Sequence, residues 1–285
     1  MRYFINLVLT VVGGSSEGHN GLKDDRPFRS SISTTTPVPS VSAISIESLL
    51  SAGRYEEAIE SVTQAVLIKS ISQIFSDEES DRILRIFKSG INYEREMLKR
   101  YNRALTTSGA ADGRLRDAAD ETSRSISAEM LKRYCIHLIE ILSNQLNLMD
   151  PHHYAGLHRA RTNAIIGDMY RYISEVSVGE DQKWYQENSL ARYTETLRVY
   201  YSAGVAPDDL ERIRVQTNRE LIMFAIPRLR HEAISSLGQT IREVEREYNK
   251  PWSRTTQEQR DFVRILEARL ELWKDQLNDE EWVVL

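Results

Sequence analysis

The chain has 285 residues, of which 41% are hydrophobic and 28% are charged. This length and balance are ordinary for a soluble globular protein, and they allow one large domain or two small ones. The net charge of −5 argues against a general nucleic-acid-binding protein, so any basic surface is a local feature. The single cysteine, Cys135, excludes an internal disulfide and favours a reducing compartment.

The first 40 residues differ in composition from the rest. A charged start, a short apolar run over 3–12 and small residues after it have the outline of a secretory signal, over residues 1–16. That run is too short to span a membrane as a helix. Because the remaining sequence looks cytosolic, we favour a cytoplasmic protein without membrane association. Residues 17–40 are rich in Ser, Thr, Gly and Pro and predict a disordered arm.

From residue 42 onward, apolar residues recur at helical spacing and no segment alternates like a strand. We expect nine antiparallel helices with mostly short connections, which is an all-α array. The expected ranges are 44–53, 54–68, 77–105, 127–149, 152–178, 181–203, 207–226 and 228–249, with a ninth helix from about 255. We therefore divide the chain into an extension (1–40), a helical domain (41–277) and an acidic tail (278–285).

Residues that carry catalytic or metal chemistry form no convincing set. Asp150, His152, His153 and His158 are close in sequence, but the histidines fall on different helix faces and no cysteine joins them. Cys135 has apolar neighbours, which is typical of a buried structural cysteine. No glycine-rich phosphate loop precedes a helix. We expect neither an enzyme nor a bound metal or cofactor.

The cations are more informative. Lys88 and Arg95 are seven residues apart, so they project from one helix face about 10 Å apart along its axis. In GDMYRYISEV (167–176), the simplest interpretation is a core-facing helix in which Asp168 pairs with Arg171, next to Tyr172. Converging cations would repel one another without an anion, and Arg donates two parallel hydrogen bonds to phosphate. A phosphoryl-recognition site is one hypothesis, and a solvated charged face is the other.

The order of helices from 42 to 276 resembles the 14-3-3 family. The fifth-helix segment GDMYRYISEV is similar to that family's GDYYRYLAE, which is a specific match. Four weaker matches have the expected order and spacing. They are AGRYEEAIESV (52–62), DRILRIFKSGINYEREMLKR (81–100), TNRELIMFAI (217–226) and ILEARLELWKDQ (265–276). AGRYEEAIESV also resembles the start of a tetratricopeptide repeat, but no second copy follows after about 34 residues.

The resemblance implies an all-α, cup-shaped protomer whose concave groove binds a phosphoserine or phosphothreonine peptide, as an adaptor in signal transduction. The phosphate-binding positions of the family fall on Lys88, Arg95, Arg171 and Tyr172. The peptide-groove positions fall on Asn218, Leu221, Ile265, Arg269 and Trp273.

Some positions depart from the family pattern. Arg269 replaces the second backbone-binding asparagine, in the last helix. Ala164 replaces a lysine beside the groove, and Ala225 replaces a glutamate. These departures put the peptide preference in doubt rather than the binding of phosphate.

The resemblance also implies a homodimer, or a heterodimer with other 14-3-3 chains. Arg54 and Glu57 match charged positions of the family's dimer interface, and the acidic partner aligns near 129–130. Two alternatives stay open: a tetratricopeptide-like scaffold that binds unmodified segments, and a degenerate paralogue with an altered or self-occupied groove. In the second, the acidic tail folds back onto the groove.

Overall fold

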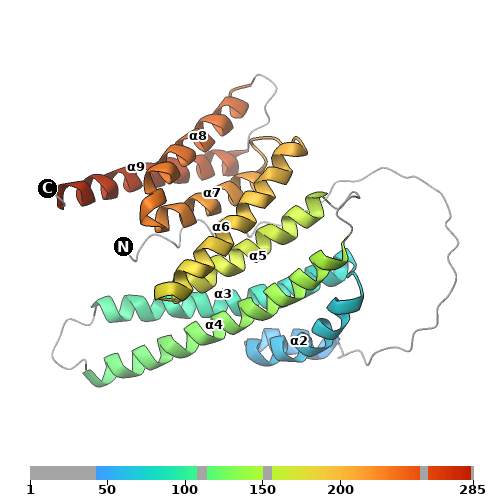
Figure 1. Ribbon diagram of the computed structural model, residues 1–285. Helices are drawn as coiled ribbons and strands as arrows, with labels where there is room; N and C mark the ends of the chain where they lie inside the picture. Colours follow the sequence, from blue (N-terminus) through green and yellow to red (C-terminus); the bar gives the residue numbers. More distant parts are fainter. Residues whose placement is uncertain (1–42, 108–113, 150–155, 251–255, 284–285) are drawn as a thin grey trace, which may run out of the picture. The chain divides into compact units, whose positions relative to one another are not determined.

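The computed structural model describes residues 43–107, 114–149, 156–250 and 256–283, which contain nine α-helices and no strand (Figure 1). This confirms the prediction of an all-α fold. The predicted extension (1–40), Asp150 and the pair His152 and His153 lie outside the described residues. The helices are α1 (Ala43–Ser51), α2 (Tyr55–Ser72), α3 (Asp77–Thr107), α4 (Arg114–Leu148), α5 (Gly156–Val176), α6 (Gly179–Ser202), α7 (Leu210–Ala225), α8 (Arg230–Tyr248) and α9 (Gln257–Val283), with a 3₁₀ turn, η1 (Pro227–Leu229), before α8.

Two helices are longer than expected. The predicted start of the fourth helix at 127 is wrong, because α4 begins at Arg114, directly after Gly113. The segment RDAADE (116–121) has little apolar periodicity, but its two alanines and Glu121 have high helix propensity, which favours helix without an apolar pattern. α9 continues to Val283 and includes most of the segment assigned to the acidic tail.

α7 begins later than expected, and its first turn shows why. The sequence PDDL (207–210) predicts a helix from Pro207, but the helix begins at Leu210. The side chain of Asp209 accepts a hydrogen bond from the backbone N–H of Arg212 at 2.9 Å, which makes Asp209 the N-cap residue.

α5 lies at the centre of the helical domain, in contact with α4, α6 and α7 (Figure 1). Its motif glycine, Gly167, determines how closely α6 approaches. A Cβ atom at this position would lie 2.9 Å from the ring of Tyr193, which is tighter than side chains allow. The absence of a side chain at Gly167 therefore brings the hydroxyl of Tyr193 within reach of Asp168, one residue further along α5.

Buried apolar side chains of the described residues gather in clusters, two of which meet at α5. The larger joins α1 to α5, and a smaller one joins α5, α6 and α7. Cys135 is fully buried in the larger cluster, as predicted, and burial raises the pKa of its thiol. Across the described ranges, no helix is long and apolar enough to cross a membrane.

Candidate functional site

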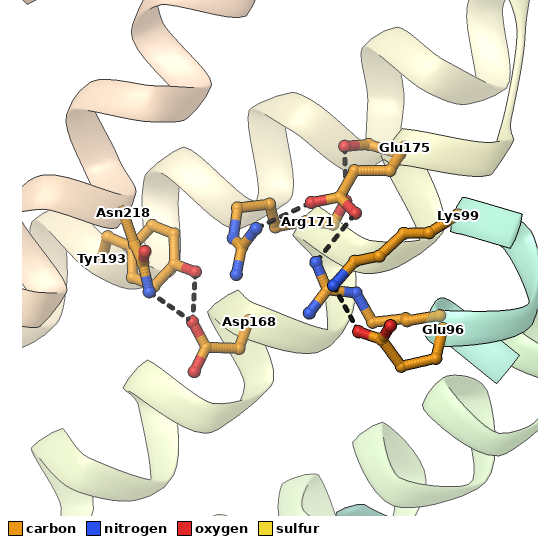
Figure 2. A network of polar contacts seen from close by, with 9 residues as sticks. Glu96, Lys99, Asp168, Arg171, Glu175, Tyr193 and Asn218 are labelled. Carbon is orange, nitrogen blue, oxygen red and sulfur yellow. Dashed lines mark hydrogen bonds and ion pairs between the residues drawn. The ribbon is translucent and has the colours of Figure 1, made fainter. Parts of the chain in front are cut away.

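Two arginines on different helices share the carboxylate of Glu175 at the centre of the candidate site, and Figure 2 labels one of them, Arg171, beside Glu175. Arg95 on α3 donates to Glu175 Oε2 at 3.2 Å, and Arg171 on α5 donates to Glu175 Oε1 at 2.7 Å. The exposed fractions of the arginines are 6% and 3%. Two buried guanidiniums around a single carboxylate leave one excess positive charge, which favours an additional anion.

Tyr172 joins these two arginines through its ring. The guanidinium carbon of Arg95 lies 4.0 Å from the ring centroid, and that of Arg171 lies 4.5 Å from it. Both guanidiniums therefore form a cation–π contact with the ring of Tyr172. Burial raises the pKa of the Tyr172 hydroxyl, with a further contribution from Asp168, so the hydroxyl stays protonated and is a hydrogen-bond donor.

Asp168 is a second centre of hydrogen bonding, and it fixes α5 to α6 and α7. It accepts from the hydroxyl of Tyr193 at 2.6 Å, from Nδ2 of Asn218 at 2.9 Å and from Arg214 at 2.7 Å. Burial alone would raise the pKa of Asp168, but the charges of Arg214 and Arg171 hold it below its ordinary value. Asp168 is therefore ionised at neutral pH.

The interpretation in which Asp168 pairs with Arg171 needs correction. Asp168 forms its ion pair with Arg214, and Arg171 pairs with Glu175 four residues later on α5. The sequence analysis missed Arg214. The available signal was its spacing, because Arg214 lies one turn before Asn218 and so shares its helix face.

The two lysines near this site lie on α3. Lys88 is exposed and stands two helical turns before Arg95, so it is on the same face of the helix. Lys99 stands one turn after Arg95, pairs with Glu96 and has a side chain that is only 15% exposed (Figure 2). Shared contacts with Glu175 bring Arg95 and Arg171 together, whereas Lys88 stays at an exposed position on the α3 face that carries Arg95.

The predicted groove residues on α7 and α9 differ in their surroundings. Leu221 and Ile265 are half-buried. Trp273 is 4% exposed, and its ring stacks on Phe224 with 4.2 Å between centroids and an interplanar angle of 3°. Arg269 is buried as well, at 7% exposure.

The other departures from the family pattern have a simple structural setting. Ala164 is fully buried in the cluster of α5, α6 and α7, so its small side chain is part of the core. Ala225 is exposed at the end of α7.

The predicted dimer residues lie at the start of α2. Arg54 donates to Glu57 Oε1 at 2.6 Å, and the two side chains are 56% and 53% exposed. Among the described residues, no group of three or more His, Cys, Asp or Glu side chains is placed to hold a metal ion.

Comparison with known proteins agrees with the resemblance drawn from the sequence. The family model described as 14-3-3 protein matches residues 45–274, which is most of the chain. The comparison with curated proteins gave no match. The family match covers all nine helices in whole or in large part, and it includes both arginines of the site and Arg269. This chain belongs to the 14-3-3 family.

Proposed function

We propose that this chain is an adaptor that binds phosphoserine or phosphothreonine segments of client proteins. Membership of the 14-3-3 family supports an adaptor role that depends on phosphorylated partners. The observation that carries the proposal for this chain is the pair Arg95 and Arg171, held around Glu175 and Tyr172. The proposed role requires recognition and no catalysis, and we place it in the cytoplasm.

The chemistry of phosphate fits this pair. A phosphate dianion offers three acceptor oxygens and about −1.5 to −2 charges at pH 7. It accepts from N–H groups of both guanidiniums while Glu175 keeps one N–H of each. Tyr172 contributes its hydroxyl as a neutral donor, and Lys88 adds a mobile positive charge from the exposed face of α3. Arginine suits such a site because its planar fork donates two parallel bonds.

The peptide on either side of the phosphate would lie along α7 and α9. Asn218 already donates one N–H to Asp168, which orients its amide and leaves its carbonyl oxygen and second N–H for a peptide backbone. Leu221 and Ile265 offer half-buried apolar surface for side chains of the peptide.

A library of peptides in phosphoserine, phosphothreonine, phosphotyrosine and unmodified forms tests this function. We expect fluorescence polarisation to show binding to phosphoserine or phosphothreonine members at least ~100-fold tighter than to their unmodified twins. Equal affinity for phosphorylated and plain twins would instead favour the scaffold that binds unmodified segments. A chain ending at Lys274 tests self-occupation, because tighter peptide binding by the shortened chain would indicate that residues 275–285 compete for the groove.

We also propose that the protein forms dimers through the face that carries Arg54 and Glu57, as a homodimer or with other 14-3-3 chains. Both side chains are exposed and carry opposite charges one turn apart. A two-fold symmetric interface would let each pair meet complementary charges on the partner.

A further inference from the structure

Arg269 on α9 is a buried cation with an unused hydrogen-bond donor. Its exposed fraction is 7%, and its Nη1 atom is buried with no hydrogen-bond partner among the described residues. Burial lowers the pKa of Arg269 to about 10, and the charge of Arg171 contributes to this shift. The guanidinium therefore remains charged at neutral pH, although a buried charged donor without an acceptor is costly.

Contacts between helices place Arg269 at the α7 side of the candidate site. Phe224 of α7 stacks on Trp273 of α9, and one turn before each of them stand Glu220 and Arg269. The charge of Glu220 acts on Arg269, as does that of Arg171 on α5. Arg269 therefore lies close enough to Arg171 for the two positive charges to interact.

Glu220 does not satisfy Arg269. Its Oε1 accepts from the hydroxyls of Ser236 and Thr240, both at 2.8 Å, and it forms no ion pair with Arg269 among the described residues. Burial raises the pKa of Glu220 to about 7, so the carboxyl is only partly ionised at neutral pH. The positive charge of Arg269 is left without a full counter-charge.

Arg171 has the same kind of unused donor. Its Nε is buried and has no hydrogen-bond partner among the described residues, although Nη1 binds Glu175. Arg171 on α5 and Arg269 on α9 thus both have N–H groups that are unpartnered in the described part of the chain, and their two positive charges repel each other. An anionic ligand that spans these two residues would satisfy both.

We infer that Arg269 is a second anion-binding residue, which makes the groove select phosphorylated segments with another acidic group close to the phosphorylated residue. The shared chemistry is an anionic oxygen group, supplied either by an Asp or Glu side chain or by a second phosphate. This inference rests on the proposed phosphopeptide function, and it concerns the specificity of that same site. An asparagine at this position would recognise the peptide backbone instead, which carries no charge preference.

A flank scan on the full chain tests the inference. The parent peptide carries one phosphothreonine with alanines at the three positions on each side. Each alanine is replaced in turn by glutamate, and in a second set by phosphoserine, and affinities are measured by fluorescence anisotropy. We expect at least one position where the acidic group strengthens binding by about tenfold or more, as for one charge-assisted hydrogen bond.

The comparison of variants uses the ratio of affinities for the acidic and alanine peptides. Arg269→Asn and Arg269→Gln should bring this ratio close to one. Arg264→Gln should keep it, because Arg264 is an exposed arginine on the same helix with its own partner, Asp261. Glutamate and phosphoserine sets distinguish a carboxylate preference from a preference for a second phosphate.

Two results would overturn the inference. The first is that no acidic group at any flanking position strengthens binding to the wild-type protein. This result does not depend on whether a variant folds. The other is a gain that Arg269→Asn retains in full. Failure of the proposed function looks different, since phosphorylated and unmodified parent peptides would then bind equally.

Discussion

The two sides of the candidate site differ in how many of their buried charged groups have partners. On the α3 and α5 side, Glu175 pairs with two arginines and Asp168 accepts from three donors, so most of the charged groups have partners and Nε of Arg171 is left without one within the described ranges. On the α7 and α9 side, Arg269 and Glu220 are buried near each other with atoms that have no partner among the described residues. Under the proposed function, the first arrangement would receive one phosphate. The second has buried polar atoms without partners in the described part of the chain on both of its charged residues, which is the basis of the inference about ligand preference.

The largest effect is expected from removal of Arg171, on the α3 and α5 side of the site. Arg171→Gln removes the charge and the fork, and each charge-assisted hydrogen bond contributes about 1.5–3 kcal/mol. We therefore expect phosphopeptide affinity to fall at least ~100-fold while the far-ultraviolet circular dichroism spectrum is unchanged. Arg198→Gln is the matched control, because Arg198 is exposed and paired with Glu195 on α6. Undiminished binding by the Arg171 variant would refute the site.

The dependence of stability on pH should reveal the protonation state of Glu220, on the α7 and α9 side of the site. The pKa of Glu220 is raised from 4.5 to about 7 in the folded protein, which corresponds to about 3 kcal/mol at ~1.4 kcal/mol per unit. The folded state binds the proton of Glu220 more tightly than the unfolded state does. The resulting stabilisation of the folded protein is complete below about pH 4.5 and is lost as pH rises to about 7. Arg219 and Arg269 face this carboxyl and oppose the shift, and Ser236 and Thr240 donate hydrogen bonds to it.

Glu220→Gln removes this proton linkage. Denaturant unfolding from pH 5 to pH 8 should show the stability of the variant rising relative to wild type by about 2–3 kcal/mol. A difference that stays constant over this range would mean that Glu220 titrates normally.

Neutralisation of Glu175, on the α3 and α5 side, should lower the stability of the free protein and increase its stabilisation by phosphopeptide. Glu175→Gln leaves two buried guanidiniums without their carboxylate, and we expect a loss of about 3 kcal/mol in the unfolding free energy. A bound phosphate then becomes their main counter-charge, so the rise in Tm on adding phosphopeptide should be larger than for wild type. A smaller rise would show that Glu175 itself positions the arginines for the ligand.

The smallest effect on stability is expected at the exposed pair on α2, which belongs to neither side of the site. Arg54→Ala should leave the unfolding free energy of the monomer almost unchanged, because both partners are more than half exposed and solvent screens their charges. If this face forms a dimer, the same change should raise the dimer dissociation constant in analytical ultracentrifugation. A wild-type protein that is monomeric at tens of micromolar would contradict the proposed dimer.

Much of the fold was predictable because it depends on local sequence. Helical periodicity, prolines and the order of segments predicted an all-α chain, and GDMYRYISEV placed Arg171 and Tyr172 in a core-facing helix, although Glu175 was not singled out. The start of α4 was missed because helix propensity, rather than apolar spacing, extends it to Arg114.

The pairing of charges across helices was not predictable. Spacing places Arg214 and Asn218 on one face, but which of them reaches Asp168 depends on how α5 and α7 pack and on side-chain rotamers. The same holds for Arg269, whose sequence position reveals a replaced asparagine but not a buried charge with an unpartnered N–H. Such features depend on contacts between residues far apart in the chain.

The most direct test of the phosphate site is a ³¹P NMR titration of the tightest phosphopeptide from the library, free and bound to the full chain. The second pKa of a free phosphomonoester is about 6. If the dianion lies against Arg95 and Arg171, this pKa should fall by at least about one unit in the complex. A bound peptide whose phosphate keeps its free pKa would contradict the account, because its phosphate would then be in solvent and not at the arginine pair.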